Sequence, residues 1–302
     1  TEVKYSSRPL VDRFEVTPER QCRAASGNSV ELAWRVHAAS AIYLNGAPID
    51  RAGSQTLAIT STTDFMLHAE NAHGVTEQQV LLAQLLERPQ VSLTGNGQPG
   101  SVSIVDGTAA LLQWSAQHAT SAHLDGEGVP TSGAHTVEPI VSSEYAFTAT
   151  NHDLCDETAT LLVTIEPIGF EDVTFDQTQT TEGDTVTLSW GYDNTLDPTY
   201  HRVTLTLPDG SEHDVTNHTS YTAPATIVGA NQFRLRLHDR HPERVIAEAA
   251  PSITAIPAPS ITRFEASHAA VCHGDQSILS WATAHADTAR LVGIGSVPAN
   301  GT

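Results

Sequence analysis

The segment that decides the fold is Glu182-Gly183-Asp184-Thr185-Val186-Thr187-Leu188-Ser189-Trp190, a turn glycine followed by alternating apolar and polar residues that end on tryptophan. Alternation with a period of two is typical of a half-buried β-strand, because successive side chains point to opposite faces. Similar segments occur at residues 27–34, 106–114 and 274–281. The four tryptophans that end them lie 80, 76 and 91 residues apart. The sequence therefore predicts four repeats.

A second pattern follows the tryptophan in the first two repeats. Phe65 and Tyr145 each lie 31 residues after that tryptophan, and each stands in an alternating segment that ends at an asparagine, Asn71 or Asn151. The openings of the first and last repeats also match, at residues 9–15 and 259–265. Agreement at several places in each repeat favours true repeats over chance similarity.

Proline-containing junctions set the predicted boundaries. We expect an N-terminal extension at 1–7 and four repeats, at 8–87, 88–166, 167–256 and 257–302. The third is longer, since Phe233 follows Trp190 by 43 residues, and the fourth holds only the N-terminal half of a repeat. Short junctions without Gly/Ser tracts predict stiff connections between repeats.

Repeats of this size, with a tryptophan in an early strand, match an immunoglobulin-type sandwich. The pattern resembles the bacterial immunoglobulin-like repeats of cell-surface and secreted proteins, and the third repeat looks more like a fibronectin type III domain. The resemblance implies an all-β fold of tandem immunoglobulin-like β-sandwiches, the fourth incomplete, in a family whose repeats are mostly spacers. We expect the cores to form around Trp34, Trp114, Trp190, Trp281, Phe65, Tyr145 and Phe233.

Charge and hydropathy exclude several classes of function. Fifteen basic and 35 acidic residues give a net charge of −20, which argues against binding nucleic acid or an anionic membrane through a broad basic surface. No apolar run approaches the length of a transmembrane helix. No basic region followed by an apolar stretch opens the chain, so no signal peptide is predicted.

The three cysteines, Cys22, Cys155 and Cys272, are an odd number. Cys22 and Cys272 precede their tryptophans by 12 and 9 residues, whereas Cys155 lies in the predicted last hairpin of repeat two. No complete repeat holds both positions, so an intradomain disulfide is not expected. An intermolecular disulfide, an interdomain disulfide and free thiols remain as alternatives.

Metal and catalytic signals are weak. His268, Cys272 and His273 are candidate metal ligands but lack the second ligand pair of a closed zinc site. The acidic turns at 125–128 and 153–157 leave calcium as an alternative, although neither has the spacing of a calcium loop. Nucleophile-elbow, zinc-protease and nucleotide-binding motifs are absent from the sequence, so we expect neither a cofactor nor an enzyme.

These observations predict a non-catalytic spacer, a rigid string of domains in an extracellular filament, a cell-surface protein or a virion appendage. Its expected partners are copies of itself or neighbouring subunits, without nucleic acid or membrane insertion. One alternative is an adhesin that binds a host surface glycan or protein, with Tyr43, Tyr192 and Tyr200 as its few candidate aromatics. Another is a set of accessory repeats in a larger secreted enzyme.

The short fourth repeat has two interpretations. Half a sandwich exposes an apolar face and open strand edges. Either the chain continues past Thr302, or a neighbouring chain completes the repeat by strand addition.

Overall fold

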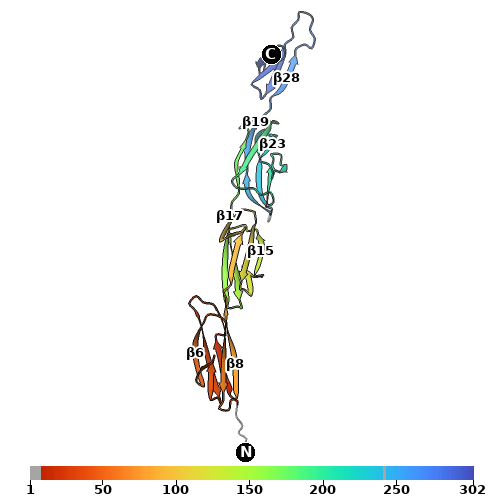
Figure 1. Ribbon diagram of the computed structural model, residues 1–302. Helices are drawn as coiled ribbons and strands as arrows, with labels where there is room; N and C mark the ends of the chain where they lie inside the picture. Colours follow the sequence, from red (N-terminus) through yellow and green to blue (C-terminus); the bar gives the residue numbers. More distant parts are fainter. Residues whose placement is uncertain (1–7, 241–242) are drawn as a thin grey trace, which may run out of the picture. The chain divides into compact units, whose positions relative to one another are not determined.

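A computed structural model describes residues 8–240 and 243–302 (Figure 1). The regular secondary structure in this part of the chain consists of β-strands alone. The all-β fold predicted from the sequence is confirmed. No helix in the described ranges has the length and apolar character needed to cross a membrane. The predicted extension at 1–7 lies outside the described residues.

The chain divides into two compact units. The first comprises Thr1–Ser103 and Ala109–Thr164, and the second comprises Ile104–Thr108 and Ile165–Thr302. Repeats one and two belong almost wholly to the first unit, and repeats three and four belong to the second.

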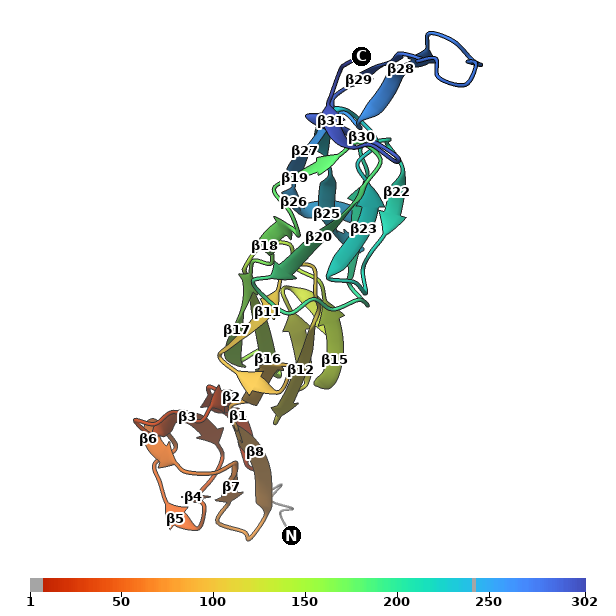
Figure 2. The same cartoon turned by 90° about the horizontal axis from the view of Figure 1, so that it is seen from above.

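Repeat one is a sandwich of two sheets, with strand orders β1-β3-β6 and β2-β8-β7-β4-β5 (Figure 2). Strand β2 runs parallel to β8, whereas β7 and β8 form an antiparallel hairpin. The eight strands are β1 (Leu10–Thr17), β2 (Arg20–Cys22), β3 (Asn28–His37), β4 (Ala41–Leu44), β5 (Ala47–Pro48), β6 (Ala52–Ile59), β7 (Thr63–Glu70) and β8 (Thr76–Leu86).

Repeat two has the same plan, with sheets β10-β9-β12-β15 and β11-β17-β16-β13-β14. Its tryptophan strand, β12, lies between β9 and β15, as β3 lies between β1 and β6. The strands are β9 (Gln90–Gly95), β10 (Gln98–Pro99), β11 (Ser101–Val105), β12 (Ala110–Gln117), β13 (Ser121–Leu124), β14 (Glu127–Val129), β15 (Ser132–Val137), β16 (Ser143–Asn151) and β17 (Cys155–Glu166).

Repeat three contains three sheets, ordered β18-β20-β23, β19-β27-β24 and β22-β21-β25-β26. A turn at Pro208-Asp209-Gly210 joins β21 and β22, and Leu207 N donates to Ser211 O across it. The strands are β18 (Phe170–Phe175), β19 (Gln179–Thr181), β20 (Thr185–Tyr192), β21 (His201–Thr206), β22 (Glu212–Asp214), β23 (Ser220–Pro224), β24 (Gly229–Gln232), β25 (Arg234–Arg240), β26 (Glu243–Ala249) and β27 (Ser252–Ile256).

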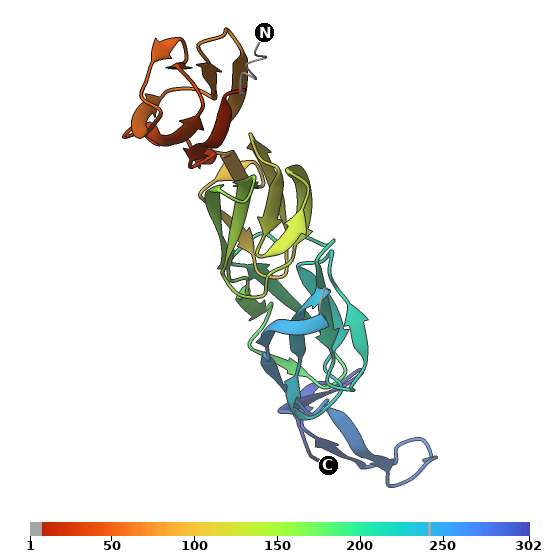
Figure 3. The same cartoon turned by 90° about the horizontal axis from the view of Figure 1, so that it is seen from below.

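Repeat four contains two strand pairs, blue in Figure 3. β28 (Ser260–Ala266) pairs with β29 (Leu279–Ala284), and β30 (Thr288–Leu291) pairs with β31 (Gly295–Pro298). These correspond in order to β1, β3, β4 and β5 of repeat one. Residues 257–302 contain these two strand pairs and no counterpart of the β7–β8 hairpin.

Five of the seven expected core aromatics are buried. They are Trp34, Trp114, Trp190, Phe65 and Phe233. Tyr145 differs, since it is only partly buried, while Phe147 two residues later is fully buried. Trp281 is also partly buried, because the strands that cover the tryptophan elsewhere have no counterpart in repeat four.

In repeats one, two and four the tryptophan ring packs on a glycine directly opposite it, within a strand pair in repeats one and two and at an isolated β-bridge in repeat four. The pairs are Trp34 with Gly53, Trp114 with Gly133, and Trp281 with Gly301. A Cβ built on Gly133 would lie 2.7 Å from Cζ2 of Trp114, well inside the usual contact distance of carbon atoms. The Trp114 Nε1–H donates to the Pro130 carbonyl at 3.0 Å, so the buried polar group is paired.

Repeat three satisfies its tryptophan differently. The Trp190 Nε1–H donates to the Tyr192 hydroxyl at 3.0 Å, two residues along the same strand. Burial raises the pKa of the Tyr192 hydroxyl, while the hydrogen bond from Trp190 lowers it by less. The neutral phenol is therefore part of the folded state of this repeat.

We predict that Gly133→Ala destabilises repeat two by about 1–3 kcal/mol, because the added methyl group overlaps the Trp114 ring. Gly128→Ala is the matched control, since a Cβ there meets no atom within 4 Å. Hydrogen exchange of the β12 amides in the full chain measures both changes. Equal protection in the two variants would contradict the packing account.

We also predict that the stability of repeat three falls with rising pH above about pH 10, the usual pKa of tyrosine. The pKa of Tyr192 is raised in the folded state, so the folded chain retains a proton that the unfolded chain loses. This contribution is full below the unfolded pKa and is lost as pH rises through the folded one. Denaturant unfolding of Tyr192→Phe should show a smaller fall over that range, and an unchanged slope would argue against the prediction.

Candidate functional site

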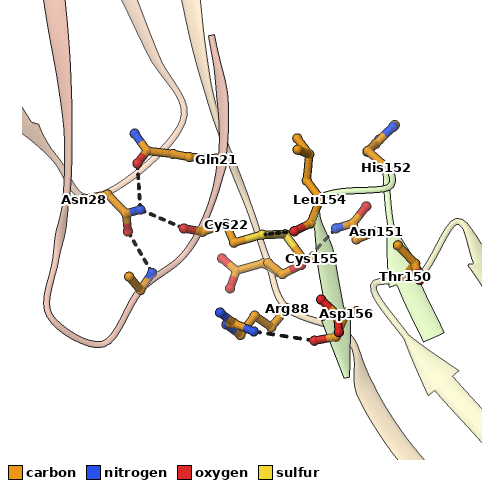
Figure 4. The surroundings of a disulfide bond; sticks show 12 residues. Gln21, Cys22, Asn28, Arg88, Thr150, Asn151, His152, Leu154, Cys155 and Asp156 are labelled. Carbon is orange, nitrogen blue, oxygen red and sulfur yellow. Dashed lines mark hydrogen bonds between the residues drawn. A yellow bond between two sulfur atoms is a disulfide. The ribbon is translucent and has the colours of Figure 1, made fainter. Parts of the chain in front are cut away.

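The first unit contains a disulfide that links repeat one to repeat two (Figure 4). Cys22 and Cys155 are bonded, with Cα atoms 5.5 Å apart and 133 residues apart in sequence. The Cys155 side chain is 1% exposed. The bond joins two successive sandwiches of one chain.

Strand pairing brings each cysteine to this junction. Cys22 ends β2 and lies opposite Leu86, the last residue of β8, so it sits where the chain leaves repeat one. Cys155 begins β17 and pairs with Asn151 across the β16–β17 hairpin. His152 and Asp153 at the tip of this hairpin have φ of 50° and 56°, the left-handed conformation that a tight turn requires.

The linker between the repeats is held from both sides. The Glu87 carboxylate accepts from Arg23 Nε at 2.9 Å within repeat one. The Glu87 carbonyl accepts from Asn151 Nδ2 at 2.9 Å from repeat two. Arg88 Nη1 donates to the Asp156 carbonyl at 3.5 Å, a weak contact. These hydrogen bonds fix the linker beside the disulfide.

Asn28 holds the segment that carries Cys22. Its Nδ2 donates to the Cys22 carbonyl at 2.7 Å and to Gln21 Oε1 at 3.0 Å, and its Oδ1 accepts from Ala24 N at 2.9 Å. Figure 4 shows this side chain reaching along the β2 segment. The cysteine is therefore presented by an ordered backbone.

Of the alternatives left open by the sequence, the structure has the interdomain disulfide for Cys22 and Cys155. The intermolecular alternative is wrong for these two cysteines, because the bond lies within one chain and between repeats. By the sequence pattern, Cys22 and Cys155 take two different positions of a single sandwich. Neither repeat one nor repeat two has a cysteine at both of these positions. The link crosses the junction because the exit of repeat one meets the last hairpin of repeat two. Cys272 is exposed and outside any disulfide in the described chain.

The weak metal candidates do not gather into a site. Among residues 8–240 and 243–302, no group of three or more His, Cys, Asp or Glu side chains is placed to hold a metal ion. His268, Cys272 and His273 are all exposed, in the connection between β28 and β29. The acidic turns at 125–128 and 153–157, which left calcium as an alternative, likewise form no such group among the described residues.

The candidate aromatics of the adhesin alternative are partly buried. Tyr43 on β4 lies beside His68 on β7, with ring centroids 6.1 Å apart. Tyr192 uses its hydroxyl for Trp190. Tyr200 precedes β21, and its carbonyl accepts from Arg240 N at 2.8 Å. Each of the three rings is therefore partly covered within its own repeat.

Repeat four presents an exposed apolar face. A cavity of about 490 Å³ opens there, lined by Phe264, Trp281 and Ile294 among others. Phe264 is 59% exposed and Ile294 is 67% exposed. In repeat one, the β7–β8 hairpin supplies Phe65 and Leu67 to the corresponding core.

No family model matches the chain. An uncharacterized protein of Ruminiclostridium cellulolyticum is 23% identical over 297 residues, which cover 91% of this chain and 72% of that protein.

Three solved structures illustrate the structural similarity. The I-band fragment of titin is 11% identical with a TM-score of 0.42, and covers 83% of this chain and 99% of its own. Three N-terminal domains of the highly immunogenic outer capsid protein of bacteriophage RB49 are 10% identical with a TM-score of 0.37, over 83% and 99%. A bacterial ice-binding adhesin of 1.5 MDa is 12% identical with a TM-score of 0.31, over 84% and 99%. The predicted tandem immunoglobulin-like sandwiches are confirmed by the paired sheets of repeats one and two themselves.

We predict that Cys155→Ser lowers the unfolding free energy of the first unit by about 2–4 kcal/mol, because a cross-link over a long loop restricts the unfolded chain. Cys272→Ser is the control and should change nothing, since that thiol is exposed and unbonded. Denaturant titration of the oxidised proteins measures the difference, and peptide mapping without reductant should recover the linked Cys22 and Cys155 peptides. Three titratable thiols in the oxidised, unfolded chain would refute the bond.

Proposed function

We propose that this protein is a non-catalytic structural protein whose tandem sandwiches act as a spacer outside the cell. The observation that supports this most strongly is the bond between Cys22 and Cys155, which joins one repeat to the next. A bond between repeats adds little to the core of either sandwich. It limits the movement of one against the other, which is the property a spacer needs.

The junction also offers a path for mechanical load. Tension applied at the chain ends reaches Cys22, crosses the disulfide to Cys155 and bypasses the residues between them. The hydrogen bonds of Glu87 to Arg23 and Asn151 add a second, weaker connection. The Cys22–Cys155 disulfide, called the disulfide clamp below, therefore protects most of repeats one and two from extension.

The same bond supports a location in an oxidising compartment. Structural disulfides persist in secreted, surface and virion proteins and are rare in reducing cytosol. We therefore propose an extracellular, cell-surface or virion-surface location. The net charge of −20 suits a well-hydrated surface in that setting.

For partners, we propose copies of this chain or neighbouring subunits of the same assembly. The net charge of −20 argues against nucleic acid as a partner. An adhesin and an accessory segment of a secreted enzyme stay as alternatives. The partial burial of Tyr43, Tyr192 and Tyr200 favours the spacer over an aromatic glycan platform.

Single-molecule extension of the full chain tests the proposal. The disulfide closes a span of 133 residues, which corresponds to roughly 440–480 Å of extended chain. We expect the oxidised protein to withhold this length under load and the reduced protein to release it. Cys22→Ser should behave as the reduced protein in both conditions, and Cys272→Ser should behave as the parent.

Release of the full length from the oxidised chain would remove the main support for the spacer. A glycan-array signal that is saturable and lost in Tyr43→Ala would favour the adhesin instead. The two measurements are independent, because single-molecule extension tests the disulfide clamp and the glycan array tests a binding surface.

A further inference from the structure

Repeat two contains a side pocket. In repeat one, larger side chains fill the corresponding space. The pocket has a volume of about 570 Å³ and lies between the sheet edges β14 and β15. Its apolar wall includes Trp114, Val129 and Val137. Asp125 and Glu127 also line it.

Repeat one gives a position-by-position comparison, because the strand registers match. Trp34 faces Gly53 as Trp114 faces Gly133, and Leu44 faces Ala47 as Leu124 faces Glu127. Eight of the pocket positions differ between the repeats. Five of these differences change the space or the acidic charge: Asn45 and Asp125, Ala47 and Glu127, Ile49 and Val129, Leu57 and Val137, and Phe65 and Tyr145. The other three are Asp50 and Pro130, Ser54 and Ala134, and Gln55 and His135.

These differences open space and add charge. Ile49 and Leu57 pack against the core of repeat one, and each is a methylene larger than the valine that replaces it in repeat two. Phe65 is 2% exposed, whereas its counterpart Tyr145 is only partly buried and lines the pocket. The result is an aromatic and aliphatic wall beside two carboxylates.

The carboxylate at Asp125 is not needed for the turn it occupies. Asp125 Oδ1 accepts from Ala146 N at 2.8 Å, and in repeat one Asn45 Oδ1 accepts from Met66 N at 2.7 Å. An amide oxygen therefore does the same structural work, and the negative charge is an extra property of repeat two. Its field reaches the pocket, since burial and then the Asp125 charge raise the pKa of the Tyr145 hydroxyl.

We propose that this pocket binds an organic cation, namely an alkyl ammonium or alkyl guanidinium group. The alkyl part would lie on Val129, Val137 and the Trp114 edge. The cationic head would lie near Asp125 and Glu127, within reach of the Tyr145 ring. Aromatic rings and carboxylates both attract such groups, whereas an anion would be repelled.

The indole N–H signals of the full chain provide the test. The Trp114 Nε1–H donates to Pro130, which also lines the pocket, and Trp114→Phe identifies its signal in a ¹H–¹⁵N spectrum. We expect butylguanidinium to shift this signal saturably and to leave the other three tryptophans unmoved. Pentanol and pentanoate, of similar length without a positive charge, should shift it little.

Two variants taken from repeat one sharpen the test. Asp125→Asn with Glu127→Ala keeps the turn hydrogen bond and should weaken butylguanidinium by about tenfold, as expected for two partly exposed charges. Val129→Ile with Val137→Leu fills the space and should abolish the shift. Both use residues that the same fold already accommodates at these positions.

Capped arginine distinguishes the source of the cation. Binding of N-acetyl-arginine-N-methylamide as well as butylguanidinium would indicate a basic side chain of a partner protein, and binding of butylguanidinium alone would indicate a free small molecule. Both outcomes support the site. No saturable shift, equal affinity for pentanol, or an unchanged shift in the space-filling variant would overturn it. None of these outcomes bears on the disulfide clamp, so the two proposals fail separately.

Discussion

The contact on which each sandwich depends is the packing of one tryptophan between two sheets. In repeats one, two and four the ring lies on a glycine of the adjacent strand, and its N–H donates to a nearby carbonyl. This arrangement needs a residue without a Cβ, so it sets the register of the strand pair. Repeat three keeps the tryptophan but pairs its N–H with the Tyr192 hydroxyl.

The same strand pairing places the cysteines. Because β2 runs beside β8, Cys22 is carried to the exit of repeat one. Because β16 and β17 form a hairpin, Cys155 lies beside the hairpin turn. This turn is at the end of repeat two that meets the exit of repeat one. The strand pairing within each sandwich thus positions the two cysteines to form a covalent bond between the sandwiches.

The repeats share a scaffold but not a surface. Repeat one fills its side opening with Ile49, Leu57 and Phe65, while repeat two leaves it open and lines it with acidic residues. Leu57 and Val137 lie on the edge strands β6 and β15, where a smaller or charged side chain costs less than in the core. Phe65 and Tyr145 lie on the inner strands β7 and β16.

The sequence by itself determined the all-β fold, the repeat pattern and most of the core, because alternating apolar residues and a spaced tryptophan reflect local burial. It also indicated that the last repeat is partial. Only the tertiary structure decided which cysteines meet, that Phe147 rather than Tyr145 fills the core, and that a glycine faces the ring. These depend on distances between strands far apart in the chain, and a pattern along one strand carries no such information.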